Sequence, residues 1–153
     1  MLGIEKVDHI GIRVSSKETS IAFYEDLGFK TLMDAGFEDG HPVILQHPCG
    51  VVINLLGPST AADGGNILMD VDEKHPGITH VSFKVASMEE TKAFLASKGI
   101  ALTGGFSFKG MEAVFIRDPD RNVIELDAYA GAEPLTRADD GGTAAEAFRQ
   151  HPG

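Results

Sequence analysis

The stretch Val7-Asp8-His9-Ile10-Gly11-Ile12-Arg13-Val14 has a counterpart further along the chain, Ile78-Thr79-His80-Val81-Ser82-Phe83-Lys84-Val85. The second histidine follows the first by 71 residues, from position 9 to position 80. At this single offset the two halves continue to match without a gap, and Val52-Ile53 falls on Val123-Ile124. A repeat of this length indicates that one supersecondary unit is present twice.

Each half shows the same order of expected elements. Apolar and polar residues alternate in the first strand of each half, which is typical of a half-buried strand. Serines at 15–16 and 87 begin helix N-terminal patterns, and Gly28 and Gly99 are placed to end the two helices. The expected strands cover residues 4–14, 29–36, 42–47 and 51–56, then 78–85, 100–107, 111–117 and 122–128. The sequence therefore predicts an α+β fold made of two tandem βαβββ modules.

The two modules are expected to occupy residues 1–58 and 78–130. Residues 59–77 contain Gly64-Gly65 and Pro76, which are turn and breaker signals, so this segment is expected to be a linker. From residue 131 the composition shifts to Gly, Ala, Asp and Thr. Residues 131–153 are therefore expected to form a C-terminal tail outside the core.

The composition argues against several classes of partner. The chain has 153 residues and a net charge of −10, whereas binding to nucleic-acid phosphates needs a basic surface. No apolar run approaches the roughly 20 residues that cross a bilayer, and the first residues lack a signal-peptide pattern. The single cysteine, Cys49, cannot form an internal disulfide. These features predict a cytoplasmic protein with no nucleic-acid or membrane partner.

Four side chains at matching positions of the two halves predict a metal site. His9 matches His80, and Asn54 matches Glu125. If the modules pack around a pseudo-twofold axis, both pairs approach that axis. Two imidazoles and one carboxylate suit Fe(II), and also Mn(II), Co(II), Ni(II) or Zn(II). A metal also explains an acidic residue inside Val-Ile-Glu-Leu, since burying an unpaired charge is costly.

With these motifs the chain resembles the vicinal oxygen chelate superfamily. That superfamily includes glyoxalase I, extradiol dioxygenases, methylmalonyl-CoA epimerase, and the fosfomycin- and bleomycin-resistance proteins. The resemblance covers residues 4–129. It rests on Val-Asp-His-Ile-Gly-Ile at 7–12, Phe23-Tyr24 with Leu27-Gly28-Phe29, Ile-Thr-His-Val at 78–81, and Arg-Asp-Pro-Asp-Arg-Asn-Val-Ile-Glu-Leu at 117–126.

The resemblance implies a fold, a cofactor and a kind of partner. The strands of the paired modules would form a cup-shaped mixed sheet, with the helices outside and one divalent metal ion inside. His9, His80 and Glu125 would be the metal ligands, and the substrate would be a small molecule with two adjacent oxygens. Because the epimerase has an amide at the position of Asn54, this residue is a candidate fourth ligand or holder of a bound water. Members often pair as homodimers.

The resemblance leaves more than one activity open, and a lyase or isomerase of the glyoxalase or epimerase kind is favoured. Glu125 is then the candidate catalytic residue, because glyoxalase I has a glutamate where Asn54 stands and an amide cannot act as a base. The alternative is an Fe(II) ring-cleaving dioxygenase, although the His and Tyr that such enzymes add have no counterpart in residues 100–117. A non-catalytic drug-binding or resistance protein is the third interpretation.

Further residues are candidates for contact with the substrate. Arg13 and Lys84 occupy matching positions on the metal-facing side and are candidates for steering an anionic substrate. Glu38 and Glu112 are candidates for a separate base. The candidates for lining the cup, or else for filling the core, are Met33, Phe37, Phe106 and Phe108.

Overall fold

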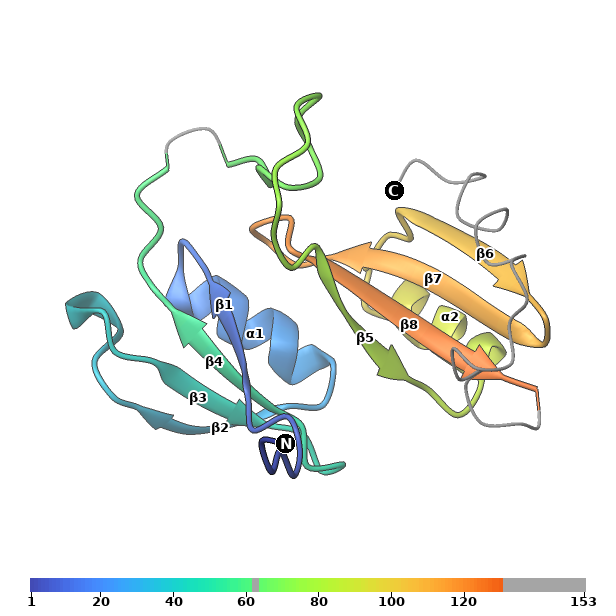
Figure 1. Ribbon diagram of the computed structural model, residues 1–153, viewed down its shortest axis with the longest axis horizontal. Helices are drawn as coiled ribbons and strands as arrows, with labels where there is room; N and C mark the ends of the chain where they lie inside the picture. The colour runs from blue at the N-terminus through green and yellow to red at the C-terminus, as the bar shows by residue number, and fades with distance from the viewer. Residues whose placement is uncertain (62–63, 131–153) are drawn as a thin grey trace. The chain divides into compact units, whose positions relative to one another are not determined.

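The computed structural model describes residues 1–61 and 64–130, so the expected tail at 131–153 lies outside the described residues. The chain divides into two compact units, Met1–Gly64 and Gly65–Gly153. Each unit contains one βαβββ module, and together they confirm the predicted α+β fold with two tandem modules (Figure 1).

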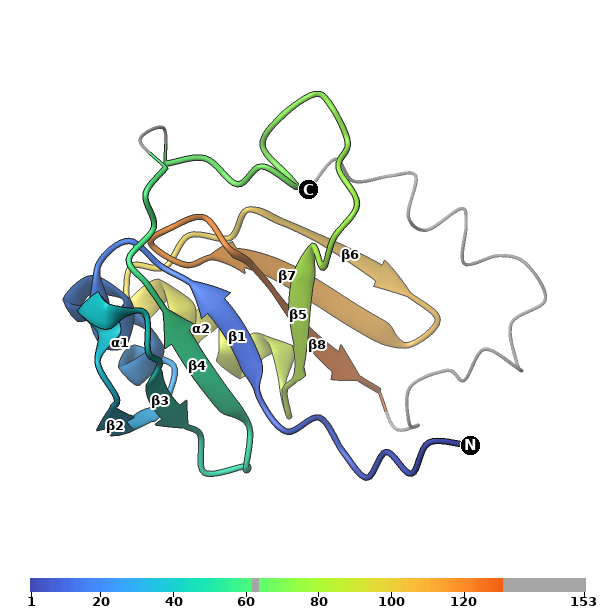
Figure 2. The ribbon, with the colours of Figure 1, turned by 60° about the vertical axis from the view of Figure 1, so that its left-hand side comes forward.

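Unit 1 builds a four-stranded mixed sheet with the strand order β1-β4-β3-β2. Strand β1 runs parallel to β4, and the other neighbours are antiparallel. Helix α1 covers one face of this sheet (Figures 1 and 2). The elements are β1 (Ile10–Arg13), α1 (Lys17–Asp26), β2 (Lys30–Asp34), the short 3₁₀ helix η1 (Phe37–Asp39), β3 (Val43–Gln46) and β4 (Val52–Leu56).

Unit 2 repeats this topology, as the sequence repeat predicts. Its strand order is β5-β8-β7-β6, with β5 parallel to β8 and the other neighbours antiparallel. Helix α2 covers one face of the sheet (Figures 1 and 2). The elements are β5 (His80–Lys84), α2 (Met88–Ser97), β6 (Gly104–Phe108), β7 (Met111–Arg117) and β8 (Val123–Tyr129).

Both helices begin and end where the sequence predicts. Ser16 and Ser87 are the N-caps, and their hydroxyl oxygens accept hydrogen bonds from the backbone N–H groups of Thr19 and Glu90. Gly28 and Gly99 follow the C-caps with φ angles of 101° and 68°, a left-handed conformation that favours glycine. The matching cap residues therefore give the two helices the same length.

The first strand is shorter than the predicted 4–14. Strand β1 pairs only with β4, and this pairing begins where Ile10 lies opposite Ile53. Ile4 and Val7 are exposed, because the segment before β1 has no strand neighbour in unit 1. His9 therefore lies immediately before β1, whereas its counterpart His80 is the first residue of β5.

Alternation along the strands decides which side chains enter the core of unit 2. In β7, Glu112 contacts Lys92 of α2, so its face of the sheet is the helix face. The residues of β8 that share this face through the strand register include Ile124 and Leu126, and both are buried. Glu125 and its neighbours at i ± 2 must point to the opposite face. That face is where the candidate site lies.

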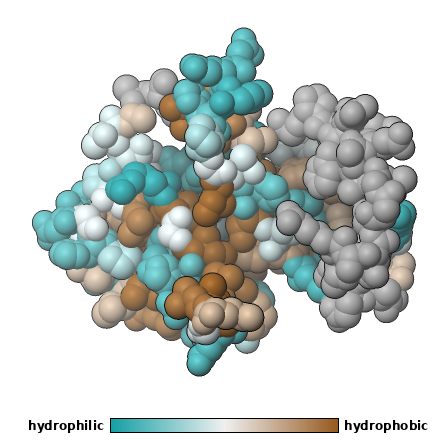
Figure 3. All heavy atoms as spheres, viewed as in Figure 1, coloured by the Kyte–Doolittle hydropathy of each residue, from teal (hydrophilic) through white to brown (hydrophobic). Residues whose placement is uncertain are grey.

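The outer surface carries further hydrophobic residues. Figure 3 shows hydrophobic side chains in brown around the N-terminal segment and over the sheet of unit 1. The exposed residues of this segment include Met1, Leu2, Ile4 and Val7. Within residues 1–61 and 64–130, none of the helices is both long enough and apolar enough to span a bilayer.

Candidate metal centre

His80 and Glu125 lie in contact on neighbouring parallel strands. The distance from His80 Nε2 to Glu125 Oε2 is 2.9 Å. Strands β5 and β8 are paired in register, and the alternation places both side chains on the face opposite α2. Glu125 is buried, with 7% of its surface exposed. A contact this short needs a proton between the nitrogen and the oxygen, and a divalent cation can replace that proton because it binds both atom types. The pair therefore fits part of a metal site.

Each candidate histidine is held through its other ring nitrogen by the residue that precedes it. Thr79 Oγ1 lies 2.8 Å from His80 Nδ1, and Asp8 Oδ2 lies 2.7 Å from His9 Nδ1. Positions 8 and 79 are equivalent in the repeat. Histidines that bind metals usually have their second nitrogen hydrogen-bonded in this way, which fixes the ring and leaves Nε2 for the ligand. The hydrogen bond to His9 also lowers the pKa of Asp8.

Unit 1 contains the two other members of the predicted set. His9 is half exposed, and Asn54 lies on β4 with Gly11 of β1 as its register partner. The side-chain oxygen of Asn54 is buried and has no hydrogen-bond partner among the described residues. A buried acceptor without a donor is uncommon and calls for an unseen partner such as water or a cation. Asn54 therefore fits the predicted role of a ligand or a water holder.

Within residues 1–61 and 64–130, no three or more His, Cys, Asp or Glu side chains form a group able to hold a metal ion. His80 and Glu125 are in direct contact in unit 2, and His9 and Asn54 belong to unit 1. The donor chemistry is nitrogen and oxygen without sulfur, which suits the first-row divalent metals.

The environment of Glu125 is unusual for a carboxyl group. Its pKa is raised from 4.5 to about 7, mainly by burial and also by the charge of the neighbouring Asp127. Asp127 lies two residues along β8 on the same face, and its Oδ2 accepts a short hydrogen bond from the Ser82 hydroxyl. In the metal-free protein, Glu125 thus keeps its proton to a higher pH than an exposed glutamate does. A bound cation would reverse this preference.

The raised pKa of Glu125 predicts how the stability of the metal-free protein depends on pH. The folded state binds more protons than the unfolded state between about pH 4.5 and 7, so this group's contribution to the unfolding free energy is complete below pH 4.5 and is lost as the pH rises to 7. The Glu125→Gln variant lacks this loss. In urea titrations with a chelator present, its stability relative to the wild type should increase from pH 5 to pH 7.5. Thr60→Val, an exposed control without a titratable group, should show a constant difference, and a flat profile for Glu125→Gln would contradict the assignment.

Two aromatic rings border the candidate ligands in unit 2. The Phe115 ring lies 6.2 Å from the His80 ring, and the Phe106 ring lies 6.1 Å from Phe115. Phe106 therefore lies on the same face of the sheet as Glu125, opposite α2. Phe37 belongs to the core and not to the lining, because it is buried with 1% of its surface exposed and its ring packs on Gly57. Met33 is exposed on the edge strand β2.

Among the suggested bases, Glu112 faces the wrong way. Its carboxylate pairs with Lys92 of α2, on the opposite face of the sheet from Glu125. Glu38 lies in η1 of unit 1. Of the two candidate cations, Lys84 has its amino group 5.7 Å from the centre of the Tyr129 ring, and Arg13 ends β1.

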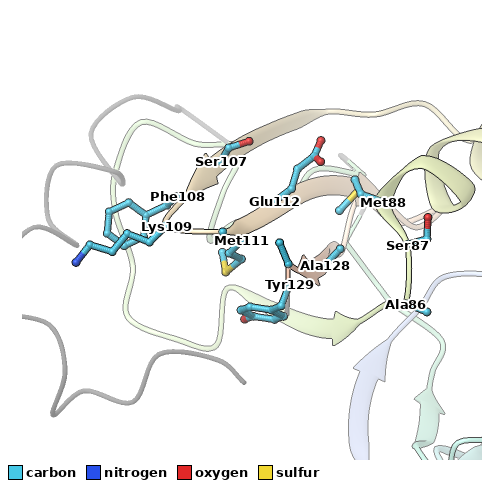
Figure 4. Close-up of a pocket in the computed structure, with 12 residues that line it drawn as sticks. Ala86, Ser87, Met88, Ser107, Phe108, Lys109, Met111, Glu112, Ala128 and Tyr129 are labelled. Atoms are coloured by element: carbon cyan, nitrogen blue, oxygen red, sulfur yellow. The ribbon is translucent and has the colours of Figure 1, made fainter. Parts of the chain in front are cut away.

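Unit 2 also contains an open pocket of about 530 Å³ that does not include His80 or Glu125 (Figure 4). It lies between the start of α2, the β6–β7 hairpin and the end of β8. Tyr129 and Met111 line it, and Phe108, predicted as a lining residue, belongs to it too. In Figure 4 the Lys109 side chain extends away from the other lining residues. His80 and Glu125 thus do not line this pocket, although Tyr129 is on the same face of β8 as Glu125.

The family model described as the glyoxalase/bleomycin resistance protein/dioxygenase superfamily matches residues 6–126. This match includes His9, His80 and Glu125 and most of the chain. The chain belongs to this superfamily. Among curated proteins, none matches the sequence significantly.

Solved structures of the glyoxalase superfamily share the fold. A glyoxalase family protein from Enterococcus faecalis is 25% identical, with a TM-score of 0.66 over 82% of this chain and 99% of its own. A glyoxalase/dioxygenase from Nostoc punctiforme is 21% identical, with a TM-score of 0.67 over 84% and 93%. An antibiotic binding protein, TnmS3, from Streptomyces sp. CB03234 is 21% identical, with a TM-score of 0.63 over 85% and 100%. The predicted fold of two tandem βαβββ modules, which the resemblance identified as glyoxalase-like, is therefore confirmed.

The sequence predicts the candidate ligands but not the residues that contact them. Asp8, Thr79, Ser82 and Asp127 were not singled out. The repeat carries a signal for the first two, because both histidines follow a residue whose side chain has an acceptor oxygen. The contact of Ser82 with Asp127 joins residues 45 positions apart, and only the pairing of β5 with β8 brings them together.

Proposed function

We propose that this protein is a divalent-metal-dependent lyase or isomerase of the glyoxalase superfamily, acting on a small substrate with two adjacent oxygens. The observation that supports it most directly is the 2.9 Å contact of His80 with Glu125, together with the braced ring of each candidate histidine. His9, His80 and Glu125 would hold the metal, with Asn54 as a fourth ligand or a water holder. The ion would supply Lewis acidity toward both substrate oxygens.

The residues of the chain have distinct parts in this proposal. Glu125 moves a proton at the substrate carbon next to the bound oxygens, since Asn54 cannot act as a base. Phe106 and Phe115 form an apolar wall that limits access of water to the reacting atoms. Arg13 and Lys84 would steer the substrate to the site. We further propose that the chain works as a homodimer, as is common in this superfamily.

Isotope exchange tests the proposed reaction. The purified chain, loaded separately with Ni(II), Co(II) or Mn(II), is incubated in D₂O with the hemithioacetal of methylglyoxal and with 2-oxo acids. Deuterium should enter the carbon next to the oxygens, as followed by NMR, and Glu125→Gln should lose this exchange while it folds normally. Bound metal without exchange in any of these compounds would contradict the proton-transfer reaction.

A ring-cleaving dioxygenase is the second candidate, because two histidines and one carboxylate form a ligand set that suits Fe(II) and oxygen chemistry. Against it, β6 and β7 contain neither His nor Tyr as an acid–base partner. Oxygen uptake with a catechol panel after anaerobic Fe(II) loading would favour it over the isomerase. A protein that binds no metal would instead favour ligand binding without catalysis; the Streptomyces structure is described as an antibiotic binding protein.

Removing the groups that brace the two rings should weaken metal binding without abolishing it. Thr79→Val and Asp8→Ala each leave a histidine ring without its partner at Nδ1. The expected loss of affinity is roughly 10- to 100-fold, as is typical for residues behind a metal-bound histidine. Competition with a chromogenic chelator measures it, and Thr60→Val, an exposed control, should have no effect. Unchanged affinity in both variants would show that neither ring orientation matters for the metal.

A further inference from the structure

Asp127 is a buried carboxylate with one oxygen that lacks a donor. Only 7% of its surface is exposed. Oδ2 accepts the hydrogen bond from Ser82, whereas Oδ1 is buried without a hydrogen-bond partner among the described residues. A buried acceptor oxygen without a donor is uncommon, so Oδ1 calls for a partner that the described residues do not supply.

The fold does not require this polar pair. At the equivalent positions of unit 1, Gly11 stands for Ser82 and Leu56 for Asp127. A Cβ atom on Gly11 would lie 3.6 Å from Leu56 Cδ1, so the two positions are also neighbours in unit 1. The same βαβββ module thus forms with a glycine and an apolar residue at these positions. If the module needed this polar pair in order to fold, both copies should contain it, but unit 1 does not.

The position of the pair relates it to the candidate ligands. Ser82 follows His80 on β5, and Asp127 follows Glu125 on β8, each by two residues on the same face. Residues two apart on a strand are roughly 7 Å apart along it. If the two adjacent oxygens of a substrate lay beside Glu125, a substrate group roughly 7 Å further along the strand would therefore reach Oδ1 of Asp127. Tyr129, the next residue on this face, lines the open pocket.

We infer that Asp127, oriented by Ser82, is a specificity-determining residue that accepts a hydrogen bond from a hydroxyl or ammonium group of the substrate. This inference rests on the proposed function, because the metal fixes the other end of the substrate. The donor would satisfy Oδ1, which otherwise stays buried without a partner. Substrates with the same two oxygens but a methyl group at the donor position would leave Oδ1 unsatisfied and bind more weakly.

Three catechols that differ in one terminal group test the inference. They are 4-ethylcatechol, 4-(2-hydroxyethyl)catechol and 4-(2-aminoethyl)catechol, and all present the same adjacent oxygens. Calorimetric titration of the full chain loaded with Co(II), without oxygen, should show that the hydroxyl or the ammonium compound binds roughly tenfold more tightly than 4-ethylcatechol. The compound that binds more tightly than 4-ethylcatechol identifies the group, hydroxyl or ammonium, that donates a hydrogen bond to Asp127.

Variants taken from unit 1 make the test specific. Asp127→Leu should remove the preference, and Ser82→Gly should reduce it, when each variant is compared with the wild type at full metal loading, as measured by elemental analysis. Asp127→Asn keeps a neutral acceptor, so it covers the case in which the leucine variant fails to fold, and it should lose any preference for the ammonium compound. Asp72→Leu removes the same charge at an exposed position and should retain the wild-type preference.

The outcomes separate this inference from the proposed function. Equal affinity for all three catechols in the metal-loaded wild type would overturn the inference and leave the metal site intact. A preference that persists in Asp127→Leu, or in Asp127→Asn for the ammonium compound, would also overturn it. Failure of the wild-type chain to bind metal would overturn both.

Discussion

Replacing His80 with alanine should abolish metal binding by the purified protein. The imidazole Nε2 is 2.9 Å from Glu125 Oε2, so the variant loses one proposed ligand and the group that positions a second. Because loss of a residue behind a ligand already costs roughly 10- to 100-fold in affinity, loss of the ligand itself should exceed roughly 100-fold. Elemental analysis after dialysis should show the metal in the wild type and only traces in the variant.

The matched control is His75→Ala. His75 is partly exposed and contacts the surface residue Glu73, so its loss should leave the metal content unchanged. Both variants should give wild-type circular dichroism, because neither side chain is in the core. Retention of metal by His80→Ala, or loss of metal by His75→Ala, would contradict the proposed ligand set.

The Gly57→Ala variant should lose several kcal/mol of stability. A Cβ atom at this position would lie 1.9 Å from Cζ of Phe37, far closer than any real contact. The Phe37 ring is buried with 1% of its surface exposed and is a rigid group, so it cannot move aside without disturbing its neighbours. Overpacking of this kind typically costs about 1–3 kcal/mol and occasionally more, and the severity of this overlap places the variant at or above the upper end.

Urea unfolding measures the change, and Gly65→Ala is the control. At Gly65 an added Cβ meets nothing within 4 Å, so that variant should stay within about 0.5 kcal/mol of the wild type. The double variant Gly57→Ala with Phe37→Leu should recover part of the loss, because the smaller side chain leaves room for the methyl group. A Gly57→Ala variant as stable as the wild type would show that Phe37 is not packed against residue 57.

The matching halves of the sequence made the fold predictable, although not the length of every strand. A single offset aligned His9 with His80 and Gly28 with Gly99, and both halves fold with the same strand order. The predicted strand over residues 4–14 was too long because alternation reports a half-buried pattern and not the extent of pairing. That extent depends on β4, whose pairing with β1 begins at Ile53.

The candidate site divides in the same way. The ligand types were readable, because histidines at matching positions and a glutamate within an apolar strand are unusual in a sequence. The face of the sheet to which the Glu112 side chain points could not be read from the sequence, because the side of β7 that faces α2 depends on how the helix packs. Phe37 was a candidate for the lining or for the core, and the packing of its ring in unit 1 decides for the core.

By itself, the sequence determined the repeated module, the helix ends, and which side chains are candidates for holding a metal, since these follow from local patterns of capping, alternation and residue chemistry. Only the tertiary structure decided that Nδ1 of each ring has a partner, that His80 contacts Glu125, and that Asp127 keeps one oxygen without a donor. The physical reason is that hydrogen bonds of a few ångströms depend on strand register and side-chain rotamers, which pairing between distant segments fixes. The sequence already shows that Ser82 and Asp127 in one half are replaced by Gly11 and Leu56 in the other. Only the structure shows that Ser82 and Asp127 form a hydrogen bond and that Gly11 and Leu56 are also neighbours.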